Sequence, residues 1–371
     1  MLNAVDSRGL SEVSGFVHAT VIIPFHRNLT QLAQSLSAAR ASMPDAEIVV
    51  AADGALDDCS SLAQTHRARV VRIPGPSGPA TARNRAADIA AGDLLFFVDT
   101  DVVVAPDALP GMCRLLDENP NIAGVFGAYD LQPPEPNFMS QFKNLSHAYV
   151  HEVGAGEAHT FWAGLGAIRA SVFRSVGGYD ERFRKPSIED IDLGVRIVAQ
   201  GHTLMLDPRF RGTHLKRWTL KSSVMTDLTA RGIPWTQLIH RSGVPKNRLN
   251  LSNALRMSVV CAYLILGGLL LAAVSPWGGA LAAVALAALI ALNADYYRWL
   301  ARQRGVGFAA TAVVAHWIHH LGNGVSFVVG TVLAFTSRIG WRLPGALPLT
   351  VWTPGFAESH RMSTSARVGH A

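Results

Sequence analysis

Two aspartates, Asp99 and Asp101, follow directly after the apolar run Leu94–Val98. Carboxylates at the end of a buried strand are costly unless they pair with a cation or bind a metal ion. Mg²⁺ or Mn²⁺ favours a few carboxylate oxygens together with phosphate oxygens of a substrate. The pair therefore predicts a site for a divalent cation and a phosphate-bearing ligand. A turn capped by two aspartates is the alternative.

A second acidic pair, Glu189 and Asp190, opens a segment whose apolar residues have helical spacing. A carboxylate at the start of such a helix can be directed into a cleft. There Asp190 would suit a general base that takes a proton from an acceptor hydroxyl. The alternative is that both acids only stabilise the positive end of the helix dipole.

Polar residues at two other points could bind a nucleotide. Asp53 ends a predicted strand, where it could hydrogen-bond a base or ribose, and Gly54 would let the backbone come close to a ligand. Arg83 lies in a helix that opens at Gly78, and the cation and the helix N-terminus both suit an anion. A plain turn and a solvated arginine are the respective alternatives.

The stretch from His214 to Trp218 brings together an imidazole, two cations and an indole. His214 could complete the shell of a metal bound by Asp99 and Asp101. Lys216 or Arg217 could hold a diphosphate. The alternative for His214 is a structural, hydrogen-bonded histidine.

An α/β sheet is expected to position these residues, because apolar runs alternate with helical patterns. The four expected strands are Ala19–Pro24, Glu47–Ala52, Arg69–Ile73 and Leu94–Val98. Ligands of parallel sheets bind at the carboxyl ends of strands. Pro24, Asp53 and Asp99 all fall at such ends, which predicts one shared site.

The C-terminal third differs in composition, with apolar stretches at residues 257–274, 278–292 and 307–336. Runs this poor in charge predict a helical hairpin in a membrane plus one further segment. We expect a leader at residues 1–17, a catalytic domain at 18–218, amphipathic interface helices at 219–253, a transmembrane region of two or three segments at 254–340, and a flexible tail at 341–371. The interface helices are expected to break at Gly232-Ile233-Pro234. A buried soluble helical domain is the alternative for the apolar region, and a pair of ordinary surface helices for the interface helices.

Basic residues flank the first two apolar stretches: Arg241, Lys246, Arg248 and Arg256 before the first, and Arg298, Arg302 and Arg304 after the second. The positive-inside rule places both groups in the cytoplasm. A simple third span would put Arg338 and Arg342 outside, against that rule. The third stretch is therefore expected to span, to re-enter, or to break at Gly322-Asn323-Gly324.

Bulk properties narrow the class of partner. The net charge of +6 suits an anionic membrane face or a phosphate-bearing substrate. The sequence contains no basic stripe interleaved with aromatic residues, which is the pattern that would indicate a nucleic-acid partner. The cysteines, Cys59, Cys113 and Cys261, show no paired spacing, so neither a disulfide framework nor a zinc site is expected. No signal-peptide pattern opens the sequence, which predicts a cytoplasmic catalytic domain.

Taken in order, these segments resemble the family 2 glycosyltransferases of the GT-A fold, over about residues 19–218. The matching segments are Val21-Ile22-Ile23-Pro24, Asp53-Gly54, Gly78 to Asn84, Asp99 to Asp101, Gly177 to Glu181, Glu189 to Arg196, and Arg217-Trp218. Two departures stand out. Ala52 and Ala55 replace the first Asp and the Ser of the family's D-D-G-S turn, and His214 replaces the Gln of Q-x-x-R-W.

The resemblance implies a Rossmann-like, mostly parallel catalytic domain followed by membrane helices. It implies that Pro24 and Asp53 contact the nucleotide, that Arg83 lies near the base or phosphate, that Asp99 holds ribose or metal, that Asp101 holds the metal, and that Asp190 is the base. The expected enzyme is an inverting, Mg²⁺- or Mn²⁺-dependent glycosyltransferase at the inner membrane. It would use a UDP-, GDP- or TDP-linked sugar and a lipid, lipid-linked or glycan acceptor.

Two rival functions are a nucleotidyltransferase and a non-catalytic membrane scaffold. A nucleotidyltransferase would need a Gly-rich basic loop after the first strand, where Phe25-His26-Arg27-Asn28 stands instead. The acidic residues Asp99, Asp101, Glu189 and Asp190 argue against a degenerate scaffold.

Overall fold

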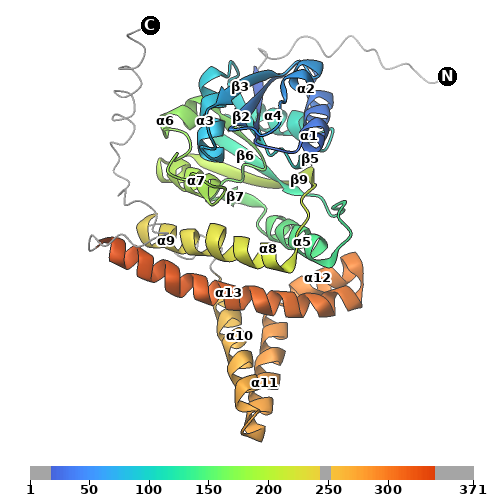
Figure 1. Ribbon diagram of the computed structural model, residues 1–371, viewed down its shortest axis with the longest axis vertical. Helices are drawn as coiled ribbons and strands as arrows, with labels where there is room; N and C mark the ends of the chain where they lie inside the picture. Colours follow the sequence, from blue (N-terminus) through green and yellow to red (C-terminus); the bar gives the residue numbers. More distant parts are fainter. Residues whose placement is uncertain (1–17, 243–251, 339–371) are drawn as a thin grey trace, which may run out of the picture.

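The structure, a computed structural model, describes residues 18–242 and 252–338. The expected leader and tail lie outside the described residues, as do Lys246, Arg248 and Arg342. Residues 19–214 form a mixed sheet covered by helices, and the segments after it form a separate helical layer and a projecting helical hairpin (Figure 1).

The strands follow one another as β1 (Ala19–Phe25), β2 (Glu47–Asp53), β3 (Arg69–Ile73), β4 (Leu94–Val98), β5 (Val102–Val104), β6 (Ile122–Tyr129), β7 (Gly156–Ala158), β8 (Leu165–Arg169) and β9 (Thr203–His214). Their order in the sheet is β3-β2-β1-β4-β8-β6-β9-β5, with β7 also on β9. The first four are parallel to one another, as the sequence predicts. The antiparallel strand β8 between β4 and β6 makes the sheet mixed.

The helices of this domain are α1 (Leu29–Ser42), α2 (Ser60–Thr65), α3 (Pro79–Ile89), α4 (Ala108–Glu118), α5 (Phe138–Val153), α6 (Ala170–Ser175) and α7 (Glu189–Ala199). Strand β4 shows why both sheet faces are covered, because all five of its residues are buried. Successive side chains point to opposite faces. Leu95 and Phe97 therefore join one apolar core, while Leu94, Phe96 and Val98 join the other.

A layer of helices follows the sheet domain: α8 (Leu220–Met225), the π-helical segment η1 (Thr226–Gly232), α9 (Ile233–Ser242), α12 (Ala294–Arg304) and α13 (Val306–Arg338). The expected break at Gly232-Ile233-Pro234 is wrong. The chain stays helical there and changes from π to α geometry between Gly232 and Ile233.

Helices α10 (Asn253–Leu271) and α11 (Pro276–Leu292) form the expected hairpin. They pack closely through glycines, since a Cβ on Gly268 would lie 2.7 Å from the backbone nitrogen of Ala282. Figure 1 shows the hairpin projecting from the helical layer on the side opposite the sheet domain. The chain bends by 73° between α11 and α12.

The third apolar stretch forms one long helix, α13, which runs crosswise to the hairpin (Figure 1). The expected alternative of a break at Gly322-Asn323-Gly324 is wrong, because the helix passes through these residues without interruption. By length and composition, α10 and α13 could each cross a membrane, and α11 with α12 could form a bent third span.

Candidate active site

The two predicted metal-binding aspartates lie in the turn between β4 and β5. The backbone nitrogen of Asp99 donates to the carbonyl of Gly164, and the nitrogen of Leu215 donates to the carbonyl of Asp101. The hydroxyl of Thr100 donates to the carbonyl of Pro24, which ties this turn to the end of β1. The carboxylates stay accessible, with 32% of the Asp99 and 26% of the Asp101 side chain exposed.

Arg83 binds two carboxylates of the protein itself. Its Nη2 lies 2.6 Å from Asp99 Oδ1 and its Nη1 lies 3.0 Å from Glu189 Oε1. Burial alone would lower the pKa of Arg83, but Asp99 and the nearby acids outweigh burial and raise it. Arg83 is thus a permanently charged bridge between the end of β4 and the start of α7.

The predicted acidic pair of α7 divides into two roles. Glu189 is buried and accepts from Arg83 and from the backbone nitrogen of Ser187 at 2.8 Å. Asp190 accepts from the backbone nitrogens of Ala163 at 3.1 Å and Ile191 at 2.8 Å. Burial and the charge of Glu189 raise the pKa of Asp190 from 3.8 to about 7. The carboxylate is held in place and is able to exchange a proton near neutral pH.

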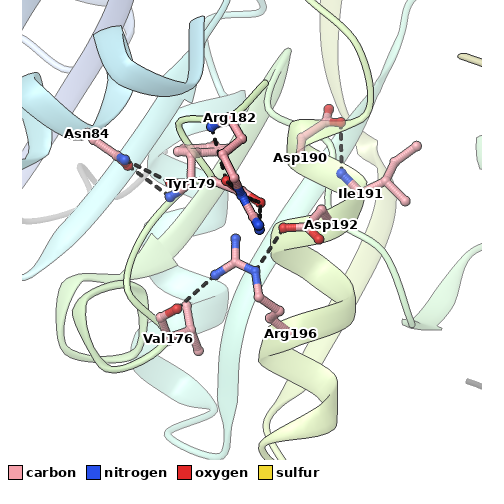
Figure 2. A network of polar contacts seen from close by, with 9 residues as sticks. Asn84, Val176, Tyr179, Arg182, Asp190, Ile191, Asp192 and Arg196 are labelled. Atoms are coloured by element: carbon pink, nitrogen blue, oxygen red, sulfur yellow. Dashed lines mark hydrogen bonds and ion pairs between the residues drawn. The ribbon is translucent and has the colours of Figure 1, made fainter. Parts of the chain in front are cut away.

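The start of α7 is fixed by a polar network around it (Figure 2). Asn84 exchanges two hydrogen bonds, both of 2.8 Å, with the backbone of Tyr179. Arg196 donates to Asp192 and to the carbonyl of Val176. Arg196 therefore ties α7, which carries Asp190, to the loop after α6, and Asn84 of the predicted phosphate segment ties the same loop to α3 through Tyr179.

His214 lies beside the aspartate pair at the end of β9. Its Nε2 is 3.5 Å from Asp101 Oδ2, and its ring stacks on Tyr129 with centroids 4.2 Å apart. Burial would raise the pKa of Asp101, but His214 and the charge of Lys216 outweigh burial and lower it. For Asp99 the balance is the opposite. Burial, together with the charge of Asp101, raises its pKa above the ordinary value despite the opposing charge of Arg83.

Arg217 and Trp218, predicted to bind the donor, have protein partners in the structure. Arg217 is exposed and forms an ion pair of 2.9 Å with Glu135. Trp218 is buried, and Lys216 Nζ lies 4.3 Å from the centre of its ring. Lys216 is the cation of this stretch whose charge acts on Asp101.

Asp53 organises the loop between β3 and α3. Its two carboxylate oxygens accept from the backbone nitrogens of Ser77 at 2.8 Å and Gly78 at 2.7 Å. Gly54 has a φ of +51°, and a Cβ there would lie 2.5 Å from the backbone of Gly75. The structure gives Gly54 a structural reason, which is the close passage of this loop, and the predicted approach of a ligand to its backbone stays a prediction.

The predicted metal ligands form an open arrangement. In residues 18–242 and 252–338, no three His, Cys, Asp or Glu side chains form a group that could hold a metal ion. Asp99 and Asp101, with His214 beside them, nevertheless offer accessible carboxylate oxygens and an imidazole. This donor set fits Mg²⁺ or Mn²⁺ if phosphate oxygens and water supply the remaining ligands.

Two contributors to this site escape sequence reasoning. Tyr129 stacks on His214, and only its position at the end of β6 could have indicated a place near the site. Ser187 links Glu189 to η1 through a side-chain bond to Ala230, for which the sequence contains no signal.

The family model described as "Glycosyl transferase family 2" matches residues 20–177, which hold Pro24, Asp53, Arg83 and the Asp99–Asp101 pair. The chain carries a family 2 glycosyltransferase domain. The resemblance inferred from the motifs is thereby confirmed, and the coarse activity of the domain is that of a glycosyltransferase.

Comparisons of the whole chain agree with this glycosyltransferase domain. The chain is 24% identical over 228 residues to an uncharacterized glycosyltransferase of Haemophilus influenzae, covering 57% of this chain and 72% of that one. It is 27% identical over 217 residues to a validoxylamine A glucosyltransferase of Streptomyces hygroscopicus subsp. jinggangensis, covering 49% of this chain and 51% of that one.

Among solved structures, the mannosyltransferase PcManGT from Pyrobaculum calidifontis, in complex with GDP-Man and Mn²⁺, resembles this chain with a TM-score of 0.50 at 17% identity. The match covers 86% of this chain and 88% of that one. The glycosyltransferase domain therefore has the predicted GT-A fold.

Proposed function

We propose that this glycosyltransferase moves a sugar, with inversion, from a nucleotide-sugar donor to a lipid, lipid-linked or glycan acceptor at the cytoplasmic face of the membrane. The observation that carries the proposal is Asp190, an anchored carboxylate whose pKa of about 7 suits a general base. Solved mannosyltransferase PcManGT, which binds GDP-Man and Mn²⁺, supports a nucleotide-sugar donor.

In this mechanism Asp190 removes the proton of the acceptor hydroxyl as that oxygen attacks the anomeric carbon. The bond from that carbon to the diphosphate oxygen breaks at the same time, and the nucleoside diphosphate leaves. Asp99 and Asp101, with His214 beside them, would hold a divalent cation. When bound, this cation neutralises the charge that builds on the diphosphate leaving group. Arg83 keeps Asp99 and Glu189 in place, so the donor-side and acceptor-side groups have a fixed separation.

The same proposal places α10 and α11 in the bilayer and the layer of α12 and α13 along its surface. With a rise of 1.5 Å per residue, α10 and α11 are about 28 and 26 Å long, close to the hydrocarbon thickness. Arg256 near the start of α10 and Arg298 in α12 then lie at the same end of the hairpin. Acceptors carried by the membrane would meet the active site from this layer.

The deciding experiment incubates membranes containing the full chain with UDP-, GDP- and TDP-sugars and Mn²⁺ and measures nucleoside diphosphate release. Release that requires one donor and a membrane extract as acceptor supports the proposal. Mn²⁺-dependent binding of UDP, GDP or TDP without release of sugar would instead indicate a non-catalytic scaffold.

A further inference from the structure

The loop between β7 and β8 joins the two halves of the candidate site through its backbone. The carbonyl of Gly164 accepts from the backbone nitrogen of Asp99 at 3.2 Å. The backbone nitrogen of Ala163 donates to Asp190 Oδ2 at 3.1 Å. Residues 163 and 164 therefore lie between the turn that carries the proposed metal ligands and the proposed base.

Trp162 precedes these two residues, and its ring folds back over Gly164. A Cβ on Gly164 would lie 2.5 Å from Trp162 Cε2 and 2.7 Å from its Nε1. The indole also contacts Tyr129 edge to face, with ring centroids 4.7 Å apart, and Tyr129 in turn stacks on His214. Because His214 lies 3.5 Å from Asp101, these contacts place the indole next to the aspartate pair.

Part of the Trp162 indole is open to solvent. The residue is half-buried, whereas residue 161 and residues 163–165 on either side of it are buried. Tyr129, His147 and His151 cover one part of its ring. Within the described ranges 18–242 and 252–338 its N–H has no hydrogen-bond acceptor, although a tryptophan N–H in a protein interior usually has one. The indole therefore offers an uncovered aromatic surface and a donor.

In the proposed reaction the transferred sugar occupies the space beside this loop. Its anomeric carbon must lie between the leaving diphosphate oxygen, on the side of Asp99 and Asp101, and the acceptor oxygen beside Asp190. We propose that the indole of Trp162 packs against the C–H face of the donor's sugar and that its N–H donates to a hydroxyl of that sugar. A sugar ring has apolar C–H groups on its face and hydroxyls at its rim, which suits an apolar ring with one polar edge.

The inference rests on the proposed function and adds a residue that positions the donor sugar. Its test compares Trp162→Leu and Trp162→Phe with Trp299→Leu in the full chain, purified in detergent. Trp299, the control, is a half-buried tryptophan of α12 that packs on Tyr149 and donates to Glu152. Thermal unfolding of each variant checks that it is folded.

A fourth variant, Gly164→Ala, retains the indole and displaces it. The added Cβ would overlap the ring of Trp162, while the backbone carbonyl that binds Asp99 is kept. This variant separates the position of the indole from its presence. It also decides the matter together with Trp162→Phe if Trp162→Leu does not fold.

Dissociation constants are measured with Mn²⁺ for three pairs: UDP-glucose and UDP, GDP-mannose and GDP, and TDP-glucose and TDP. Comparison within a pair isolates the sugar, because both members share the nucleotide and the metal. For the sugar nucleotide that the wild type binds most tightly, we expect Trp162→Leu to weaken binding about tenfold and to leave the matching diphosphate unchanged. Trp162→Phe should recover part of the affinity, Gly164→Ala should resemble Trp162→Leu, and Trp299→Leu should bind like the wild type.

Three results would overturn the inference. Equal weakening of both members of a pair would mean that the indole only supports the nucleotide and metal site through its loop. Unchanged binding of both members in folded Trp162→Leu and Gly164→Ala variants would mean that the indole does not contact the sugar. Unchanged donor binding with a raised KM for the acceptor would assign the indole to the acceptor instead.

The inference and the proposed function fail in different ways, because donor binding is measured without transfer. If the wild type transfers no sugar from any donor, the proposed function is wrong. Selective loss of sugar-nucleotide binding in Trp162→Leu would still show the sugar contact in that case. If the wild type is active and Trp162→Leu binds both members of each pair normally, only the inference fails.

Discussion

At the scale of single residues, Asp101 is the proposed metal ligand whose loss should cost most. Its carboxylate is accessible and its pKa is lowered, so it stays ionised at neutral pH. We expect Asp101→Asn, which keeps the shape and removes the charge, to reduce turnover by about 10²- to 10⁴-fold. Turnover is measured at saturating Mn²⁺. Asp117→Asn, at an exposed position of α4, is the matched control. Full turnover in Asp101→Asn would contradict the proposed metal role.

Asp190 predicts how the rate depends on pH. With a pKa of about 7, its basic form increases as the pH rises, so kcat/KM should climb about tenfold per unit below pH 7 and level off above it. Asp190→Asn should lose this limb together with most of the activity. Retained activity with a flat profile would point to an acceptor that is already ionised, such as a polyprenyl phosphate.

The same shift has a consequence for stability with a defined sign. The folded state binds the Asp190 proton more tightly than the unfolded chain, whose ordinary pKa is 3.8. The residue therefore contributes stability below pH 3.8 that is lost as the pH rises through about 7. Asp190→Asn should flatten this part of the stability–pH curve.

Sequence reasoning identified the residue types of the site better than their partners. Asp99, Asp101, Glu189, Asp190 and His214 do come together, because strand ends and helix starts of an α/β sheet meet at one edge. Arg83 was predicted to lie near the base or phosphate of a bound nucleotide, and this stays a prediction. Its anions in this structure are two side chains of the protein, and one of them is more than a hundred residues away in sequence. No local pattern encodes a contact of that range.

At the scale of elements, the packing of α13 against η1 should affect the site. A Cβ on Gly232 would lie 2.3 Å from Ser326 Oγ and 2.9 Å from the carbonyl of Asp227. Gly232→Ala should therefore push η1 away from α13 and strain the hydrogen bond that the Ser187 hydroxyl donates to the carbonyl of Ala230. We expect a loss of about 1–3 kcal/mol in stability and a lower rate of transfer.

The double variant Gly232→Ala, Ser326→Gly tests this explanation directly. Removing the hydroxymethyl group relieves the closest contact and leaves the one with Asp227, so partial recovery of stability and transfer is expected. Gly267→Ala is the matched control, because a Cβ there meets nothing within 4 Å. No recovery in the double variant would show that the α13 contact is not the cause.

The direction of α13 is an element-level feature that composition could not predict. An apolar stretch of this length suits a membrane span and an interfacial helix equally well. Its direction depends on where close contacts form, and here Gly330 fits against Thr236 of α9 while Ser326 fits against Gly232. These contacts join segments about ninety residues apart, so hydropathy alone leaves the direction open.

At the scale of the whole molecule, these contacts argue that α13 lies along the membrane surface. Helix α9 follows directly from η1, which touches the catalytic loop at Ser187. Helix α13 is packed on α9, and His240 lies 3.0 Å from Thr331 across that interface. If α13 crossed the bilayer, it would have to separate from α9 and η1, which contact the sheet domain. In the proposed topology, with only α10 and α11 as spans and the catalytic domain in the cytoplasm, both ends of α13 would lie on the cytoplasmic side, and Arg338 would then satisfy the positive-inside rule.

Cysteine labelling in intact cells tests this arrangement. In a chain whose native cysteines Cys59, Cys113 and Cys261 are replaced by alanine, single cysteines are placed at Val274, Val306 and Phe335, all of which are exposed. We expect a membrane-impermeant maleimide to label position 274, in the turn between α10 and α11, from outside. Positions 306 and 335 should label only after permeabilisation. Because a spanning α13 must present one of its ends to the outside, labelling of either position in intact cells would contradict a surface-lying helix.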